Sequence, residues 1–264
     1  MLPDDLAAGL AEALGGLESL LGGLLADFPF TESYLNYGRN AARAGNLDIT
    51  NTTTNPCIST GYDGYYEYNG INYKATSPAR GANFYKCSKL TKRILNIKTP
   101  CNFGSCTFNG AWSGGGGAGQ KTIYVASYFY EMTAEAGVIP LDVPSGKVRP
   151  VDFKNAAKLA CKTRVEDMTT VFPQITSGNE PFLCMDFMYA YTLLVDGFGL
   201  HPSHELTAMN VIDYQSFSVE VAWPLGCAID VVSMINNPVY EMNLARLESL
   251  RLDAASKVAS LEVM

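Results

Sequence analysis

The first segment that could do chemistry is the glycine-rich stretch CNFGSCTFNGAWSGGGGAGQ, residues 101–120. The backbone N–H groups of such a loop can hold phosphate, so a P-loop is the first hypothesis. Gly114 and Gly119 have the separation that this motif needs, but Gln120 stands where the motif has Lys. The next element, from Thr122, is strand-like, whereas a P-loop opens a helix. The pattern therefore favours a close turn, in which glycine permits positive φ.

The cysteines and histidines argue against a zinc site. The two histidines, His201 and His204, share one Pro/Ser-containing loop, and no two cysteines form a C-x-x-C pair. Six of the seven cysteines could form three disulfides, which indicates an oxidising compartment, although spacing alone leaves their pairing open. Asn51 begins an Asn-Thr-Thr glycosylation sequon that fits this compartment. The cysteines are Cys57, Cys87, Cys101, Cys106, Cys161, Cys184 and Cys227.

Composition and charge are those of a globular chain. Its 264 residues are 47% hydrophobic and 17% charged, and the net charge is −7. The negative charge argues against a nucleic-acid partner, but not against a nucleotide bound with a divalent cation. No apolar run is long enough for a transmembrane helix. The segment 1–30 has acidic residues and no Lys or Arg, so it is interpreted as an amphipathic helix and not as a recognisable signal peptide.

Turn residues and periodicity predict the elements that must position these groups. Thr31 is a candidate N-cap, and Gly45 a stop, for a helix over 32–44. The tyrosine-flanked Asn69-Gly70 pair is typical of a hairpin, within a disulfide-stapled β insertion at 46–110. The sequence further predicts a buried strand at 125–130 leading into a helix that stops near Gly137, helices at 151–163 and 180–195, a strand at 206–212, a mostly helical 214–232 and a last helix at 239–262.

Six stretches together carry a family pattern. They are SYLNYGRNAARAG (33–45), NPCISTGY (55–62), CTFNGAWSGGGGAGQK (106–121), VRPVDFKNAAKLAC (148–161), PFLCMDFMYAYTLLVDGFGL (181–200) and VAWPLGCAID (221–230). Over about 33–232 the chain resembles the GDA1/CD39 family of nucleoside phosphatases, the apyrases, and its plant members most closely.

This resemblance implies a mixed α/β fold, leaning to α+β, with a lobe of the actin/RNase H type. It implies a secreted or endomembrane-lumen enzyme that hydrolyses nucleoside tri- and diphosphates to the monophosphate with Ca²⁺ or Mg²⁺. A Glu-activated water attacks the terminal phosphate, and the cation stabilises the developing charge.

Only the C-terminal lobe of that fold is expected in this chain. The sequence contains no DAGS-type phosphate loop, TAGLR-type segment, catalytic-Glu segment or DLGG loop. We therefore expect an incomplete lobe at 31–232, flanked by non-family segments at 1–30 and 233–264 that add terminal helices. We also expect no catalytic residue, no metal ligand and no hydrolysis by the isolated chain; another chain could supply the missing N-terminal lobe.

The resemblance also suggests residues for the site. Tyr130 and Phe198 match positions where aromatic rings sandwich the nucleobase, and the alternative for each is a core or rim aromatic. Trp223 and Gly226 match the last family motif and are expected beside the cleft. The implied disulfides are Cys57–Cys87, Cys101–Cys106 and Cys161–Cys184, which leaves Cys227 as a buried thiol.

Asp186 and Asp196 are the acidic residues nearest the family motifs. A lone Asp on a helix is interpreted as a solvated or capping group and not as a metal ligand. Two alternatives to a hydrolase lobe stay open: a non-catalytic module that binds nucleotide, glycan or protein, and a truncated or recombined product whose terminal helices cover an exposed sheet edge.

Overall fold

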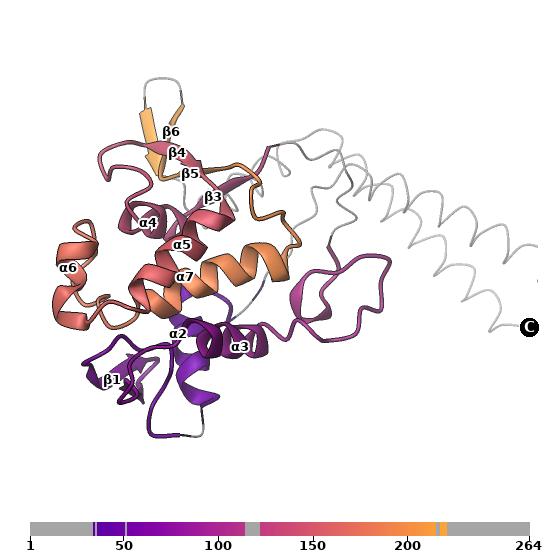
Figure 1. Cartoon of the computed structure of the whole chain (residues 1–264). Helices are drawn as coiled ribbons and strands as arrows, with labels where there is room; N and C mark the ends of the chain where they lie inside the picture. Colours follow the sequence, from indigo (N-terminus) through magenta and orange to yellow (C-terminus); the bar gives the residue numbers. More distant parts are fainter. Residues whose placement is uncertain (1–33, 35, 51, 114–121, 215–216, 221–264) are drawn as a thin grey trace, which may run out of the picture.

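The computed structural model describes residues 34, 36–50, 52–113, 122–214 and 217–220 (Figure 1). Several expectations lie outside these residues: the helices at 1–30 and 239–262, the glycine loop at 114–121, and the roles of Asn51, Trp223, Gly226 and Cys227. They stay predictions.

The described part is a mixed α/β fold with one three-stranded sheet and two two-stranded hairpins. The strand order of the three-stranded sheet is β3-β5-β4, with β3 (Tyr124–Ala126) parallel and β4 (Ser145–Val148) antiparallel to the central β5 (Leu206–Met209). In Figure 1 the sheet and α4 (Tyr128–Glu135) lie at one end of the molecule, and α2, α3 and the hairpin strand β1 lie at the other. Helices α5 (Pro150–Ala160) and α7 (Leu183–Thr192) lie between them and pack against each other.

Helix α7 forms the centre of the core because it is apolar on nearly every side. Nine of its ten residues are buried, as expected for a helix with no polar face. It continues as a π-helical turn over Leu193–Gly197, and a Cβ at Gly197 would lie 3.0 Å from the Phe108 ring. The predicted helix at 180–195 is confirmed, although it begins at Leu183, after Pro181.

Helix α2 (Arg39–Asp48) corrects the prediction of a helix over 32–44. Asn36 has φ 69°, and Gly38 is extended, so the described residues before Arg39 are not helical. The helix also continues through Gly45, because a single glycine weakens a helix without ending it.

The region 46–110 contains the predicted hairpin but is not all β. Strands β1 (Asp63–Tyr68) and β2 (Ile71–Thr76) pair antiparallel, and Asn69 and Gly70 have φ 52° and 75°, as a two-residue hairpin turn requires. The same region also forms helix α3 (Phe84–Ile94), which the β prediction missed. Its N-cap is Asn83, whose side chain accepts the Lys86 N–H at 2.9 Å.

The predicted strand at 125–130 is wrong after Ala126. Ser127 has φ 55° and ψ −129°, which turns the chain sharply into α4. Tyr130 therefore lies on a helix that ends before Gly137, as predicted.

The region from Leu206 also differs from prediction. It forms two strands, because β5 ends at Met209 and β6 (Val211–Tyr214) then pairs antiparallel with β7 (Phe217–Glu220). The mostly helical segment predicted at 214–232 is wrong at residues 217–220, which form strand β7. Residues 221–232 lie outside the described residues. The predicted helix at 151–163 is confirmed as α5. The remaining elements are α6 (Met168–Val171) and two short 3₁₀ turns, Phe108–Gly110 and Val165–Asp167.

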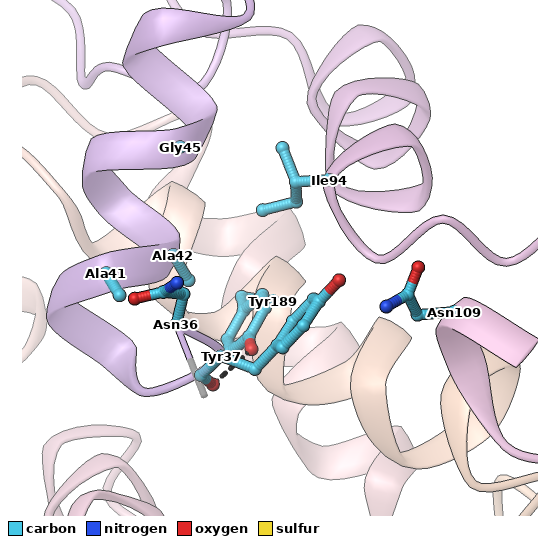
Figure 2. A pocket seen from close by; sticks show the side chains of 8 residues that line it. All are labelled: Asn36, Tyr37, Ala41, Ala42, Gly45, Ile94, Asn109 and Tyr189. Carbon is cyan, nitrogen blue, oxygen red and sulfur yellow. Dashed lines mark hydrogen bonds between the residues drawn. The ribbon is translucent and has the colours of Figure 1, made fainter. Parts of the chain in front are cut away.

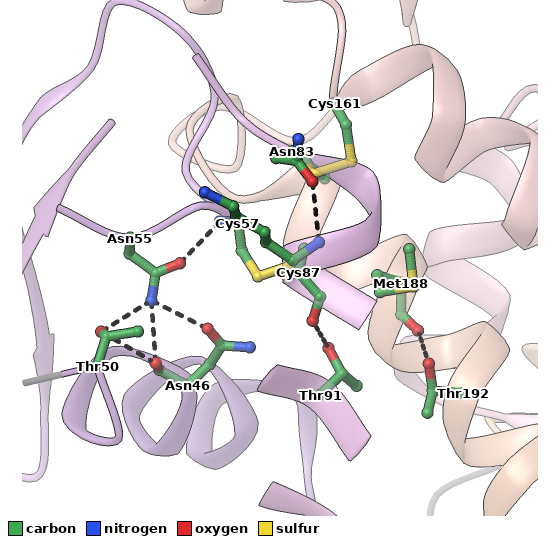
Figure 3. Close-up of a disulfide and its surroundings, with 12 residues drawn as sticks. Asn46, Thr50, Asn55, Cys57, Asn83, Cys87, Thr91, Cys161, Met188 and Thr192 are labelled. Carbon is green, nitrogen blue, oxygen red and sulfur yellow. Dashed lines mark hydrogen bonds between the residues drawn. A yellow bond between two sulfur atoms is a disulfide. The ribbon is translucent and has the colours of Figure 1, made fainter. Parts of the chain in front are cut away.

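Three disulfides crosslink this fold, and they are the pairs that the resemblance implies. Cys57–Cys87 joins the segment before the hairpin to α3 (Figure 3), and Cys161–Cys184 joins the end of α5 to α7. Cys101–Cys106 closes a short loop. None of the helices in the described ranges combines the length and apolarity that a membrane span requires.

Candidate functional site

A polar cleft lies at the carboxyl end of β3, where α4 begins. In sheets with parallel strands, ligands commonly bind outside the carboxyl ends of the strands. The cleft has a volume of about 500 Å³ and is formed by the start of α2, the turn into α4 and the tip of the hairpin. The residues that line it are Asn36, Gly38, Arg39, Asn40, Ala41, Tyr68, Ser127, Tyr128, Glu131 and Asn179.

Arg39 connects the wall of this cleft to the buried interior. Its guanidinium donates through Nε to Asp186 Oδ2 at 3.0 Å and through Nη2 to Glu135 Oε2 at 2.9 Å. A third bond, through Nη1, reaches Glu131 Oε2 at 3.2 Å, at the surface of the cleft. One side chain of α2 therefore holds carboxylates from both α4 and α7.

Arg43, one helical turn further along α2, completes a closed ring of polar contacts. Its Nε donates to Asp186 Oδ1 at 2.9 Å, and its Nη2 contacts Asp186 Oδ2 and donates to Asn179 Oδ1 at 2.9 Å. Asn179 Nδ2 in turn donates to Glu135 Oε1 at 2.8 Å. The Arg43 guanidinium also lies 4.8 Å from the centre of the Phe182 ring, a cation–π contact.

The ionisation of Asp186 and Arg43 in this charged ring is determined by burial and by the opposite charges beside them. Burial opposes the ionisation of Asp186, but Arg43 and Arg39 outweigh it, so the pKa of Asp186 lies below its ordinary value. Burial likewise opposes the charge on Arg43, yet Asp186 raises the pKa of Arg43 above its ordinary value. These ionised groups balance one another, so their charges are not available to a ligand.

This ring corrects the expectation for Asp186, which is 2% exposed and is neither solvated nor a cap. The signal that sequence reasoning missed is the pair Arg39 and Arg43, four residues apart and therefore on one face of a helix. Asp196 is different, because its partly exposed carboxylate accepts a bond from Lys92 Nζ at 2.8 Å.

Phe198 lies at the edge of an aromatic cluster. Its ring is 41% exposed and meets the rings of Tyr34 and Phe108 edge-on, with centroids 5.8 and 5.5 Å away. Tyr37 extends the cluster behind Phe108, at 4.8 Å. The edge-on contacts and the exposure leave part of the Phe198 ring open to a ligand.

Tyr130 is placed differently from Phe198. It is 5% exposed, and its hydroxyl lies 2.6 Å from the carbonyl oxygen of Val143 and 3.1 Å from that of Leu141. Within the described ranges its ring makes no contact with the cluster around Phe198. The structure therefore gives the two predicted nucleobase residues different surroundings, a buried ring for Tyr130 and a partly exposed ring for Phe198.

The described residues do not fit a resident divalent cation. None of them forms a group of three or more His, Cys, Asp or Glu side chains placed to hold a metal ion. The carboxylates of Asp186 and Glu135, which lie beneath the cleft, are already paired with arginines.

Comparison with known proteins places this chain beside nucleotide-hydrolysing relatives. The family model of the GDA1/CD39 (nucleoside phosphatase) family matches residues 27–251. The chain is 46% identical over 210 residues to an apyrase from Solanum tuberosum, which covers 80% of this chain and 46% of that protein. It is 41% identical over 207 residues to a nucleoside-triphosphatase from Pisum sativum, covering 78% of this chain and 46% of that protein.

A more distant match extends to animals. The chain is 24% identical over 217 residues to ectonucleoside triphosphate diphosphohydrolase 5 from Gallus gallus, which covers 78% of this chain and 44% of that protein. The chain thus spans about half the length of the relatives it matches.

Proposed function

Because the chain belongs to the GDA1/CD39 (nucleoside phosphatase) family, we propose that it is the C-terminal, nucleoside-binding lobe of an apyrase-type hydrolase. The reaction is the hydrolysis of nucleoside tri- and diphosphates to the monophosphate with Ca²⁺ or Mg²⁺. The observation that carries this proposal is the family match, which covers most of the chain. The lobe is proposed at 31–232, with 1–30 and 233–264 as flanking segments; the family match over 27–251 reaches beyond both bounds.

In this proposal Phe198 stacks on the nucleobase. Its ring is partly exposed and lies in T-shaped contact with Tyr34 and Phe108, and a stacked ring accepts any base because every base has a π face. Tyr130 is assigned to packing instead, because its hydroxyl and its buried ring are already engaged. Trp223 and Gly226 are proposed to lie beside the cleft.

The isolated chain is proposed to bind nucleotide without hydrolysing it. The sequence contains none of the family segments that hold the phosphates or the catalytic Glu. Three disulfides support a secreted or endomembrane-lumen location, in which Asn51 would be glycosylated.

Phosphate release from ATP and ADP, with Ca²⁺ or Mg²⁺, tests this function. We expect none from the chain alone, and turnover when the missing N-terminal half of the Solanum tuberosum apyrase is joined to it. Turnover by the chain alone would contradict the proposed inactivity but not the reaction. Nucleotide binding without turnover in the joined protein would favour the alternative of a non-catalytic nucleotide-binding module.

A further inference from the structure

A second pocket, separate from the charged ring, lies between α2 and α3 (Figure 2). Its volume is about 360 Å³, within the range of small-molecule sites. It shares only Asn36 and Ala41 with the cleft at β3, and its lining residue Tyr37 also belongs to the aromatic cluster. The residues that line it are Asn36, Tyr37, Ala41, Ala42, Gly45, Ile94, Asn109 and Tyr189.

None of these lining residues is charged, and this sets the pocket apart. Three other pockets in the described part of the chain are lined by Lys, Arg or Glu side chains, such as Arg80 and Lys86 in one, Arg39 and Glu131 in another and Lys158 in a third. A site for phosphate or for a cation needs opposite charge or a dense set of oxygen ligands. This lining therefore suits an uncharged molecule better than it suits phosphate or a cation.

Three side chains of the pocket carry polar groups that the other described residues do not engage. The side-chain amides of Asn36 and Asn109 and the hydroxyl of Tyr37 have no hydrogen-bond partner among the residues that the structure describes. Figure 2 shows the Asn109 amide turned toward the Tyr37 ring. Each side-chain amide offers an N–H₂ group as donor and a carbonyl oxygen as acceptor, and the Tyr37 hydroxyl can donate or accept a hydrogen bond. Tyr189 takes no part, because its hydroxyl donates a short bond to the carbonyl oxygen of Tyr37.

The remaining wall is aliphatic and open. Ala41, Ala42 and Gly45 follow one side of α2, and Ile94 faces them from α3 (Figure 2). Such a wall packs against C–H groups, while amides and a phenol bind hydroxyls. A pyranose sugar combines these two properties, since its ring has an apolar C–H face and its edge carries hydroxyl groups.

We propose that this pocket is a binding site for an uncharged pyranose sugar. The site does not depend on the proposed hydrolase reaction, because it uses neither Phe198 nor the charged ring. A change at Gly45, which lines this pocket but not the cleft at β3, therefore tests sugar binding separately from nucleotide binding, and the two proposals can fail separately.

The experiment titrates the full chain with methyl α-D-glucopyranoside and N-acetylglucosamine, with adenosine as the uncharged comparison, by saturation-transfer NMR and calorimetry. Gly45→Leu places a side chain in the pocket, because Gly45 lines it and a Cβ there meets no atom within 4 Å. Gly104→Leu is the matched control, since its Cβ is equally unobstructed and it does not line the pocket. Circular dichroism checks that both variants fold.

We expect a pyranose to bind the parent chain and Gly104→Leu with the same affinity, and Gly45→Leu to lose binding. Asn109→Gly removes one amide while keeping the positive φ of 56°, and it should weaken binding about two- to tenfold. The proposal is overturned if neither sugar binds at about 50 mM, far above a millimolar Kd. It is also overturned if sugar binding survives Gly45→Leu. The same holds if Gly45→Leu abolishes the binding of adenosine but not that of either sugar.

Discussion

Arg39 and Asp186 are 147 positions apart in the sequence, yet the Arg39 Nε donates to Asp186 Oδ2 at 3.0 Å. Both side chains are buried, and Arg43 binds the same carboxylate from the next turn of α2. The bond therefore fixes α2, at the start of the described chain, against the core helix α7. Glu135 brings α4, which begins at the candidate cleft, into the same ring.

Removing the charge of Asp186 should be severely destabilising. Asp186→Asn leaves the buried guanidinium groups of Arg39 and Arg43 without their shared carboxylate, and breaking a buried ion pair from one side costs about 3–5 kcal/mol. Chemical denaturation measures this loss. The control is Asp196→Asn, which breaks a partly exposed pair with Lys92 and should cost under about 1 kcal/mol. Equal losses of stability in the two variants would show that the buried charged ring around Asp186 stabilises the fold no more than an exposed ion pair does.

Acid should destabilise the chain through the same carboxylate. The pKa of Asp186 is lower in the folded state than its ordinary value of 3.8, so the folded state favours the ionised form. Its contribution is therefore fully present above about pH 4–5 and is lost as the pH falls below 3.8 toward the depressed folded pKa. Urea midpoints measured from pH 7 down to pH 2 report the slope. Asp196→Asn should keep this acid slope, and a flat profile in the parent chain would contradict the assignment.

A methyl group at Gly45 should stabilise the chain. Gly45 lies inside α2, and no atom lies within 4 Å of the position that a Cβ would take, so Gly45→Ala should gain about 0.5–1 kcal/mol from helix propensity alone. Gly137 offers equal space but has φ 73°, so Gly137→Ala should lose about 1 kcal/mol. Thermal or urea unfolding of both variants measures the contrast. A loss at Gly45 would mean that the helix is constrained there by contacts outside the described residues.

The proposed base-stacking role of Phe198 predicts a selective loss of nucleotide binding. Phe198→Ala should weaken binding of ATP and of ADP by similar factors, about 5- to 150-fold, because one base stack contributes about 1–3 kcal/mol. Phe198→Trp should retain binding, since it keeps an aromatic face. Phe103→Ala, at another exposed ring in the short disulfide loop, is the matched control and should change nothing. Unchanged ATP affinity in Phe198→Ala would remove Phe198 from the site.

Turn and capping residues in the sequence correctly predicted the hairpin and two of the helices. Asn69-Gly70 specifies its hairpin turn by itself, and the helices at α5 and α7 have their own proline, capping or glycine boundaries. The turn at Ser127 could not be predicted in the same way, because a serine has no local reason to adopt φ 55° and is held there by the packing of α4 on the sheet. A β-rich composition likewise concealed α3, although Asn83 supplies its cap.

The charged ring shows why the candidate site was only partly predictable. Asp186 has an ordinary helical setting in the sequence, and its partners become neighbours only when α2 packs on α7. The exposure of Phe198 and the burial of Tyr130 likewise depend on tertiary packing, which a matching motif does not specify. The disulfide pairs came from the family resemblance, not from spacing.

The described disulfides fall into two separate groups along the chain. Two of the three described crosslinks lie within residues 57–106 and the third joins Cys161 to Cys184, so none of them crosses the interval between Cys106 and Cys161. A single backbone cut in that interval would therefore yield two fragments that these disulfides do not tie together. The fragments would be held by α7 packing on α3 and by the salt bridges from Arg39 and Arg43 to Asp186. The interval between Cys106 and Cys161 is therefore suited to fragment complementation. Reassembly of the two fragments would measure how strongly the contacts of Arg39 and Arg43 with Asp186 hold them together.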